Sequence, residues 1–285
     1  MARRWLVTGC SSGLGRAVAE AVARAGDLAV VTARDAASLA DLVEAWPSNL
    51  VPVAMDLRDE QQCQDAVNAA REQFGGVDVL VNNAGSGLFG AVEEVSDEEL
   101  REQFESVVFG PWRLVRLVLP IMRAQRSGHI VNVSTAAVGT AVPGISAYLS
   151  GKQALEGMSR SLAAEVAAFG IRVTVIEPGA YATNYGNVLR ETSTRLPEYA
   201  DVYGMIGMFR GMADNPEFGR PEEFARDLLG IVDASAPLPL RIPLGPASYE
   251  MRGAALQEAG DEIESAQALT SRDPDLEHGP VAELA

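Results

Sequence analysis

The sequence is poor in cysteine, histidine and positive charge, and each shortage excludes a class of protein. The two cysteines among its 285 residues, Cys10 and Cys63, cannot form a disulfide framework and are typical of a reduced cytosolic protein. The two histidines, His129 and His278, are too few for a zinc site or a histidine-based catalytic triad. We therefore expect no bound metal.

The charge balance and the lack of long apolar runs exclude further partners. Lysine and arginine together number 23 against 39 aspartates and glutamates, which gives a net charge of −16. A surface with this charge repels phosphate backbones and anionic lipids, so we expect neither nucleic acid nor a membrane as a partner. No apolar run approaches the ~18 residues of a membrane span. The first residues, MARRW, lead directly into a strand-like segment, so no signal peptide is predicted and a cytoplasmic location is favoured.

Short β-branched runs alternate with helical stretches along most of the chain. Near-continuous apolar strands separated by helices indicate a parallel sheet covered on both faces. The predicted fold class is therefore α/β: a doubly wound, seven-stranded parallel sheet with helices on both faces, known as the Rossmann fold. The seven expected strands are Trp5–Thr8, Leu28–Thr32, Leu50–Met55, Val77–Val81, His129–Ser134, Ile171–Ile176 and Leu238–Ile242.

Local signals predict where two of the long helices begin or end. Ser96 followed by Glu99 is a capping-box pattern, which begins a helix running toward Arg123. Gly170 stands where the helix Ala147–Phe169 is expected to end.

The alternation of strands and helices predicts one domain over residues 1–260. Between residues 182 and 220 the alternation breaks, and tyrosine and methionine accumulate. The last segment, residues 261–285, is polar and acidic, which predicts a loosely ordered tail.

The first strand leads into the glycine-rich turn TGCSSGLG, residues 8–15, and then into a helix rich in alanine and valine. Glycines at such a turn permit a tight bend, close approach of the backbone to a pyrophosphate, and close packing of helix on strand. The N-terminus of the helix supplies free N–H groups and the positive end of its dipole to the anion. This context predicts a dinucleotide-binding turn. Its candidate cofactor contacts are Gly9, Ser11, Ser12, Gly13, Leu14 and Gly15.

The spacing of this turn resembles that of the short-chain dehydrogenase/reductase family, and three further segments agree in order and position. Asn82–Gly85 is similar to the family's NNAG motif, Tyr148–Lys152 to its YxxxK motif, and Pro178-Gly179 with Thr183 to its PGxxxT segment. Together these motifs span roughly residues 5–250. The resemblance implies an enzyme with a nicotinamide cofactor, and it places further cofactor contacts at Asp56, Leu57, Asn83, Ala84, Gly85, Tyr148, Lys152, Pro178, Gly179 and Thr183.

The end of the second strand favours NADP(H) over NAD(H). In the family, the acid that selects NAD usually occupies the position of Ala33, where a carboxylate binds the ribose 2′-hydroxyl and repels a 2′-phosphate. Arg34 follows and offers a planar fork of donors to a phosphate. Asp35 leaves an alternative open, because it either pairs with Arg34 or binds the hydroxyl itself.

Tyr148 and Lys152 are the expected catalytic pair. Residues four apart lie on one face of a helix, so both side chains reach the same ligand. A phenol has a pKa of about 10, and a neighbouring ammonium lowers it by stabilising the phenolate, which makes proton exchange practical near neutral pH. The resemblance adds that the lysine also holds the nicotinamide ribose.

The hydroxyl that binds the substrate oxygen is assigned to Thr135, with Ser134 as the alternative. The family's serine precedes the tyrosine by thirteen residues, which corresponds to Thr135. Adjacent strand residues point to opposite faces, so Ser134 reaches the ligand only if the strand shifts by one residue.

The largest departure from the family pattern is Val107, at the position of an asparagine that holds a water for proton relay. Valine has no polar group for this purpose. Four readings stay open: the valine packs in its helix and the enzyme works without the relay, proton delivery is slower, the relay is rebuilt around Ser106 or another residue, or the chemistry is not hydride transfer. Gly151, inside the YxxxK motif, also replaces a more usual alanine or serine.

Residues 182–220 correspond to the family's variable substrate lid. Tyrosine, phenylalanine and methionine side chains there suit a bulky apolar or aromatic ligand, such as a polyketide-like or steroid-like ring system. The predicted function is an NADP(H)-dependent oxidoreductase that interconverts a ketone and a secondary alcohol, with Tyr148 as general acid/base. The alternative is a protein of this fold diverted to cyclase or epimerase chemistry, or to NADPH sensing, given Val107 and Thr135. The resemblance also implies a homodimer or homotetramer.

Overall fold

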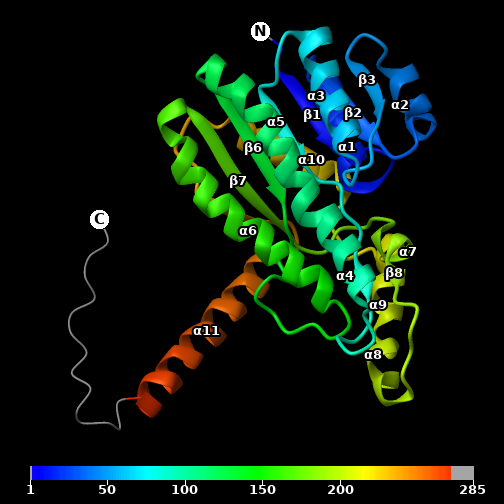
Figure 1. Cartoon of the computed structure of the whole chain (residues 1–285), viewed down its shortest axis with the longest axis vertical. Coiled ribbons are helices and arrows are strands. Elements are labelled where there is room, and N and C mark those ends of the chain that lie inside the picture. Colours follow the sequence, from blue (N-terminus) through cyan, green and yellow to red (C-terminus); the bar gives the residue numbers. More distant parts are fainter. Residues whose placement is uncertain (1, 271–285) are drawn as a thin grey trace.

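The computed structural model of the protein describes residues 2–270 (Figure 1). Its centre is a seven-stranded sheet in the order β3-β2-β1-β4-β6-β7-β9, with every pair parallel. The chain builds outward from β1 in one direction and then returns to build outward from β4 in the other, which confirms the predicted doubly wound fold. The strands are β1 (Arg4–Thr8), β2 (Leu28–Ala33), β3 (Leu50–Ala54), β4 (Val79–Asn82), β6 (Gly128–Val133), β7 (Ile171–Pro178) and β9 (Arg241–Leu244).

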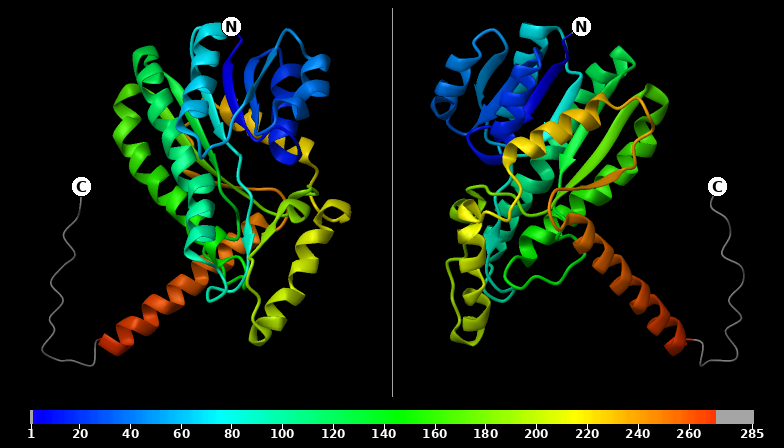
Figure 2. Two further views of the ribbon diagram at one scale, coloured as in Figure 1. Left: turned by 45° about the vertical axis from the view of Figure 1, so that its right-hand side comes forward. Right: turned by 180° about the vertical axis from the view of Figure 1, so that it is seen from behind.

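Helices cover both faces of the sheet (Figure 2). One hydrophobic cluster lies on each face of the sheet. The β1 strand contributes Trp5 and Val7 to one cluster and Leu6 to the other. This alternation follows from the two-residue period of a strand, and it explains why the strands are apolar throughout. One face packs against α1 (Gly13–Arg24), α2 (Ala40–Ala45) and α10 (Pro221–Asp233), and the other against α3 (Glu60–Phe74), α5 (Gly110–Gln125) and α6 (Ser146–Val166).

The helix expected from Ser96 toward Arg123 is divided into three parts. The capping box is present, since Ser96 Oγ accepts from the Glu99 amide at 3.2 Å. The α4 helix (Asp97–Phe104) then passes into a π-helical turn, Glu105–Phe109, before α5 begins. Such turns insert a residue into the helical repeat and are frequent at functional sites.

The α6 helix ends as predicted. It passes through a 3₁₀ turn, Ala167–Phe169, to Gly170, whose φ of 72° is left-handed, and β7 follows directly. Further 3₁₀ turns are Ala36–Leu39, Pro197–Tyr199 and Gly211–Asp214.

Residues 182–220 form a separate layer over the carboxyl ends of the strands. Its elements are the short helices α7 (Tyr185–Val188), α8 (Ala200–Gly204) and α9 (Ile206–Arg210) and the strand β8 (Arg190–Glu191). The β8 strand pairs with β5 (Leu88–Phe89) in a small parallel sheet that the sequence did not predict. We call residues 182–220 the lid.

The C-terminal part of the described chain differs from the sequence prediction. The α11 helix (Ser248–Thr270) projects from the body (Figure 2) and includes residues 261–270, where a loosely ordered tail was expected. The remaining residues of that expected tail, 271–285, lie outside the described part of the chain. No helix within residues 2–270 is long and apolar enough to cross a membrane.

Candidate active site

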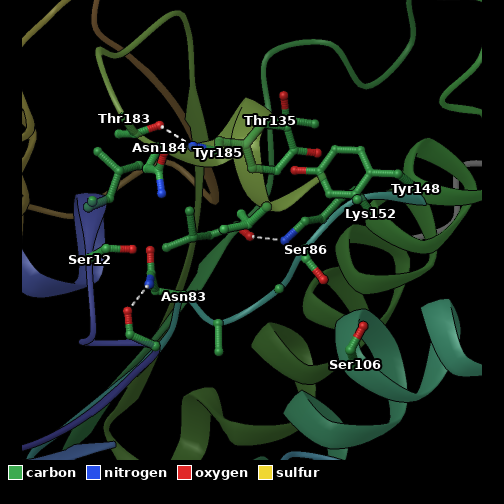
Figure 3. Close-up of a pocket in the computed structure, with 18 of the residues that line it drawn as sticks. Ser12, Asn83, Ser86, Ser106, Thr135, Tyr148, Lys152, Thr183, Asn184 and Tyr185 are labelled. Carbon is green, nitrogen blue, oxygen red and sulfur yellow. Dashed lines mark hydrogen bonds between the residues drawn. The ribbon is translucent and has the colours of Figure 1, made fainter. Parts of the chain in front are cut away.

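A cavity of about 550 Å³ lies at the carboxyl ends of the central strands, under the lid (Figure 3). The sheet reverses its order between β1 and β4, and ligands of doubly wound proteins bind at this point. The cavity brings together residues that the sequence predicted from separate motifs. Those lining it are Gly9, Ser11, Ser12, Gly13, Leu14, Arg34, Asp56, Leu57, Asn83, Ala84, Gly85, Ser134, Thr135, Tyr148, Lys152, Pro178, Gly179 and Thr183.

The turn between β1 and α1 accepts only glycine at two of its positions. Gly9 has a φ of 75°, and a Cβ atom there would lie 2.9 Å from Cα of Ala84. A Cβ atom on Gly15 would overlap the Gly9 carbonyl oxygen and lie 2.9 Å from its carbon. Gly15 therefore does not line the cavity as predicted; it lets the helix approach the strand closely.

The NNAG segment is bound directly to this turn. The amides of Asn83 and Ala84 donate to Thr8 Oγ1 at 3.0 and 2.9 Å, and Asn83 Nδ2 donates to the Thr8 carbonyl at 2.9 Å. These bonds hold the ends of β1 and β4 in one rigid unit. Thr183, from the start of the lid, lies over the same turn, 3.5 Å from the position of a Cβ atom on Gly13.

The N-terminus of α1 fits a phosphate group. Ser12 is its N-cap in an extended conformation, and the serine side chain makes no capping hydrogen bond. The first amides of this 12-residue helix are thus left without a side-chain acceptor at the cavity. Free amides and the helix dipole together bind an anion, so the residues present fit the pyrophosphate of a dinucleotide.

Three charged residues that follow β2 and β3 have different surroundings. Asp35 caps the following 3₁₀ turn, accepting from the Ala37 amide at 2.9 Å. Asp56 pairs with Arg58 at 2.7 Å, and this hydrogen bond lowers the pKa of the Asp56 carboxyl. Arg34 is exposed at the cavity and makes no hydrogen bond or ion pair within residues 2–270.

Tyr148 and Lys152 lie on the first turns of α6, on the face that lines the cavity. The Lys152 ammonium lies 5.6 Å from the centre of the Tyr148 ring and donates to the Val133 carbonyl at 2.7 Å. Burial raises the pKa of Tyr148 to about 12 and lowers the pKa of Lys152 to about 8, since it disfavours the charged form of each group.

Ser134 and Thr135 direct their hydroxyls to different partners. Ser134 Oγ donates to Glu156 Oε1 at 2.6 Å and is almost fully buried. Thr135, two residues beyond the end of β6, is half-buried at the cavity, and within the described chain its hydroxyl makes one hydrogen bond, accepted from the Ala137 amide at 3.3 Å. The Thr135 hydroxyl thus stays available to a ligand while that of Ser134 is engaged.

Val107 fills a space that two glycines leave beside Lys152. It lies in the π-helical turn and is fully buried. A Cβ atom on Gly151 would overlap Cγ2 of Val107, and one on Gly85 would lie 3.3 Å from its Cγ1. Ser106, the neighbouring hydroxyl, donates to the Gln103 carbonyl of its own helix at 2.9 Å. The valine and Gly151 are therefore matched in size, and the packing reading of Val107 agrees with the geometry.

A buried ionic network that the sequence reasoning missed lies next to Tyr148 and Lys152. Glu156, one helical turn after Lys152, accepts a hydrogen bond from Ser134 and forms an ion pair with Arg241 at 2.9 Å. Arg241 and Arg252 also face Glu177, at 3.5 and 3.8 Å. The sequence held one sign of this network: Glu156 follows Lys152 by four residues and therefore lies on the same face of the helix.

Comparisons with known proteins agree with this geometry. A family model described as short chain dehydrogenase matches residues 3–194. The chain belongs to that family. It is 37% identical over 265 residues to an oxidoreductase of Botryotinia fuckeliana, covering 92% of this chain and 96% of the relative. It is 32% identical over 258 residues to retinol dehydrogenase 8 of Bos taurus, covering 84% of this chain and 80% of that relative.

Solved structures extend the likeness to three dimensions. A short-chain dehydrogenase from Streptomyces avermitilis superposes with a TM-score of 0.86 at 39% identity, covering 97% of this chain and 99% of that one. Other structures that share the fold hold NADP+ in one case and NAD in another. The protein is thus an enzyme, an oxidoreductase of the short-chain dehydrogenase/reductase family, whose members bind NAD(P) and act on small molecules.

Proposed function

We propose that the protein is an NADPH-dependent ketoreductase, interconverting a ketone and a secondary alcohol. One observation carries the proposal: Tyr148, Lys152 and Thr135 line the same cavity as the anion-binding turn. The bound cofactor supplies the hydride. Tyr148 gives the proton to the forming alkoxide, the charge on Lys152 stabilises the resulting phenolate, and Thr135 donates to the substrate oxygen.

The surroundings of Arg34 support the choice of NADP(H). Its guanidinium is free to form the bidentate pair that a 2′-phosphate favours. Asp35, the alternative contact, is engaged in capping a turn, and Ala33 leaves no carboxylate at the position that selects NAD.

The lid supports a bulky apolar or aromatic substrate, in the class of polyketide-like or steroid-like rings. Tyr185, Val188, Phe209 and Met212 bring apolar surface to the cavity. The relative named retinol dehydrogenase acts, by its name, on a large apolar alcohol.

The geometry does not favour the diverted alternatives, cyclase or epimerase chemistry and NADPH sensing. They depended on Val107 and Thr135, and both departures have a local explanation. Val107 packs into the space of Gly151, and Thr135 keeps a hydroxyl at the cavity.

We also propose that the protein is a cytoplasmic homodimer or homotetramer. Phe109 and Trp112 stand 46% and 48% exposed near the start of α5, where a second copy would cover them. Cys10 and Cys63 are both free and buried, as suits a reducing compartment.

The experiment that tests the reductase proposal measures NADPH oxidation with a panel of bulky ketones. Wild-type protein is expected to turn over at least one of them, and Tyr148→Phe to lose turnover by about 10³-fold while still binding NADPH. Turnover that survives in Tyr148→Phe would overturn the assignment of the proton donor. Preference for NADH would overturn the assignment of Arg34, and failure to bind either cofactor would overturn the redox proposal.

A further inference from the structure

We propose that the Tyr185 hydroxyl is a second hydrogen-bond donor to the substrate, which carries another oxygen on the carbon next to the reacting carbonyl. The substrate class is then a vicinal dicarbonyl or an α-hydroxy ketone. The inference rests on the proposed ketoreductase function, because the carbonyl must bind at Tyr148.

Tyr185 has a buried hydroxyl without a partner. The residue begins α7 in the lid and lines the cavity. Its hydroxyl oxygen is inaccessible to solvent and makes no well-formed hydrogen bond within the described residues. A buried hydroxyl that lacks a partner destabilises the fold, and such groups in native proteins are rare and point to a ligand or a function.

The chain makes room for this hydroxyl. A Cβ atom on Gly87 would overlap the Tyr185 hydroxyl oxygen and lie 3.3 Å from the ring carbon that carries it. The same Cβ atom would lie 2.6 Å from Cδ1 of Leu189. Glycine at position 87 thus lets the Tyr185 phenol reach its place beside the cavity.

The Tyr185 hydroxyl faces the catalytic tyrosine. The ring centres of Tyr185 and Tyr148 lie 5.9 Å apart, and the two hydroxyls point toward one another (Figure 3). Burial raises the pKa of both phenols, and their proximity raises the pKa of Tyr185 further while it opposes part of the shift of Tyr148. Each phenol keeps its proton at neutral pH and serves as a donor, and once Tyr148 donates to a bound carbonyl, Tyr185 is left to donate elsewhere.

The number of hydrogen-bond donors around the reacting carbonyl indicates that the substrate carries a second oxygen. A carbonyl oxygen has two lone pairs, and in the proposed reaction these accept from Tyr148 and Thr135. The Tyr185 donor then needs an acceptor of its own. Because its hydroxyl lies next to that of Tyr148, the matching oxygen belongs on the neighbouring carbon atom.

The test compares two ketones that differ by one oxygen. The probes are 1-phenyl-1,2-propanedione and 1-phenyl-1-propanone, and the measurement is kcat/KM with NADPH for wild type and Tyr185→Phe. We expect the variant to lose at least about tenfold with the diketone and less than about twofold with the monoketone, since only the diketone loses a hydrogen bond. The control is Tyr199→Phe, a phenol of the lid outside the cavity, whose hydroxyl donates to Glu93; we expect no selective loss there.

Other results of this comparison would overturn the inference or the proposed function. Equal losses with both probes would show that Tyr185 shapes the lid and would overturn the inference, as would no loss with either. If wild type reduces other ketones of the panel but neither probe, the inference is overturned and the proposed function stands. If it reduces no ketone at all, the proposed function fails and the inference fails with it. Thermal unfolding checks that a loss of activity in Tyr185→Phe does not come from misfolding. The substitution removes a hydroxyl without a well-formed hydrogen bond, so the Tm of the variant is expected to equal or exceed that of wild type.

Discussion

Val107 and Gly151 occupy one shared space beside Lys152, because a Cβ atom on Gly151 would overlap Cγ2 of Val107. Val107 comes from the π-helical turn and Gly151 from α6, in the middle of the YxxxK motif. The two residues that depart from the family pattern are thus matched in size: the valine at position 107 fits because position 151 is a glycine.

This pairing predicts strong coupling between substitutions. Gly151→Ala is expected to lower the free energy of unfolding by about 1–3 kcal/mol through overpacking. Val107→Ala removes the clashing methyl groups, so the double variant should recover part of that loss. Urea unfolding of the single and double variants measures the coupling. Gly157→Ala is the matched control on the same helix, because a Cβ atom there meets nothing within 4 Å, and it should stabilise by about 0.4–1 kcal/mol. Strictly additive effects would contradict the shared space.

Arg34→Ala is expected to weaken NADPH binding about tenfold to a hundredfold and to leave NADH binding unchanged, since only NADPH has a phosphate for the guanidinium. Isothermal titration calorimetry with each cofactor measures both. The control is Asp35→Ala, which removes the cap of the 3₁₀ turn and should cost about 0.5–2 kcal/mol of stability without changing this preference. Equal weakening for both cofactors would refute the assignment of Arg34.

Thr135 and Ser134 are expected to separate into a catalytic and a structural hydroxyl. Thr135→Val should lower kcat about tenfold to a hundredfold and leave NADPH affinity unchanged. Ser134→Ala should act mainly on stability, by about 1–3 kcal/mol, because Glu156 loses a buried donor. Steady-state kinetics and thermal unfolding of both variants distinguish the two hydroxyls. The reverse pattern would assign the substrate contact to Ser134.

The charge on Lys152 sets the expected pH dependence. Burial lowers its pKa to about 8, while the carboxylate of Glu156 opposes this shift. The ammonium is present below that pKa and is lost as pH rises through it, so kcat/KM for reduction should fall above about pH 8. Glu156→Gln removes the opposing carboxylate and should move the fall to lower pH.

The matched control for this profile is Glu165→Gln, an exposed residue of the same helix. Its profile should coincide with that of wild type. A profile that stays flat from pH 7 to pH 9 (roughly one unit on either side of the shifted value) would contradict the assignment to Lys152. Thermal unfolding checks that Glu156→Gln, which also loses an ion pair with Arg241, remains folded.

The sequence predicted the central sheet well because the strands of a parallel sheet are buried on both faces. Their apolar runs, such as the one around Leu6 and Val7, stand out against the helices between them. Elements that depend on distant partners were missed. The β5 and β8 strands have two residues each and exist only because Leu88 pairs with Arg190. The π-helical turn likewise leaves no periodic signal.

The residues of the site likewise fall into those that a local pattern predicts and those whose contacts only the fold determines. The glycine turn and the Tyr148–Lys152 spacing are local patterns whose chemistry follows from backbone freedom and helix geometry, so the sequence alone was sufficient to predict them. The engagement of Ser134 with Glu156, the capping by Asp35 and the unpartnered Tyr185 hydroxyl depend on which groups meet in the folded chain. Composition and local pattern determined the fold class, the family and the candidate pair Tyr148 and Lys152. Only the tertiary structure decided which of the remaining polar groups are free to meet a ligand, because a hydrogen bond formed across distant segments removes a group from the site without leaving a trace in the local sequence.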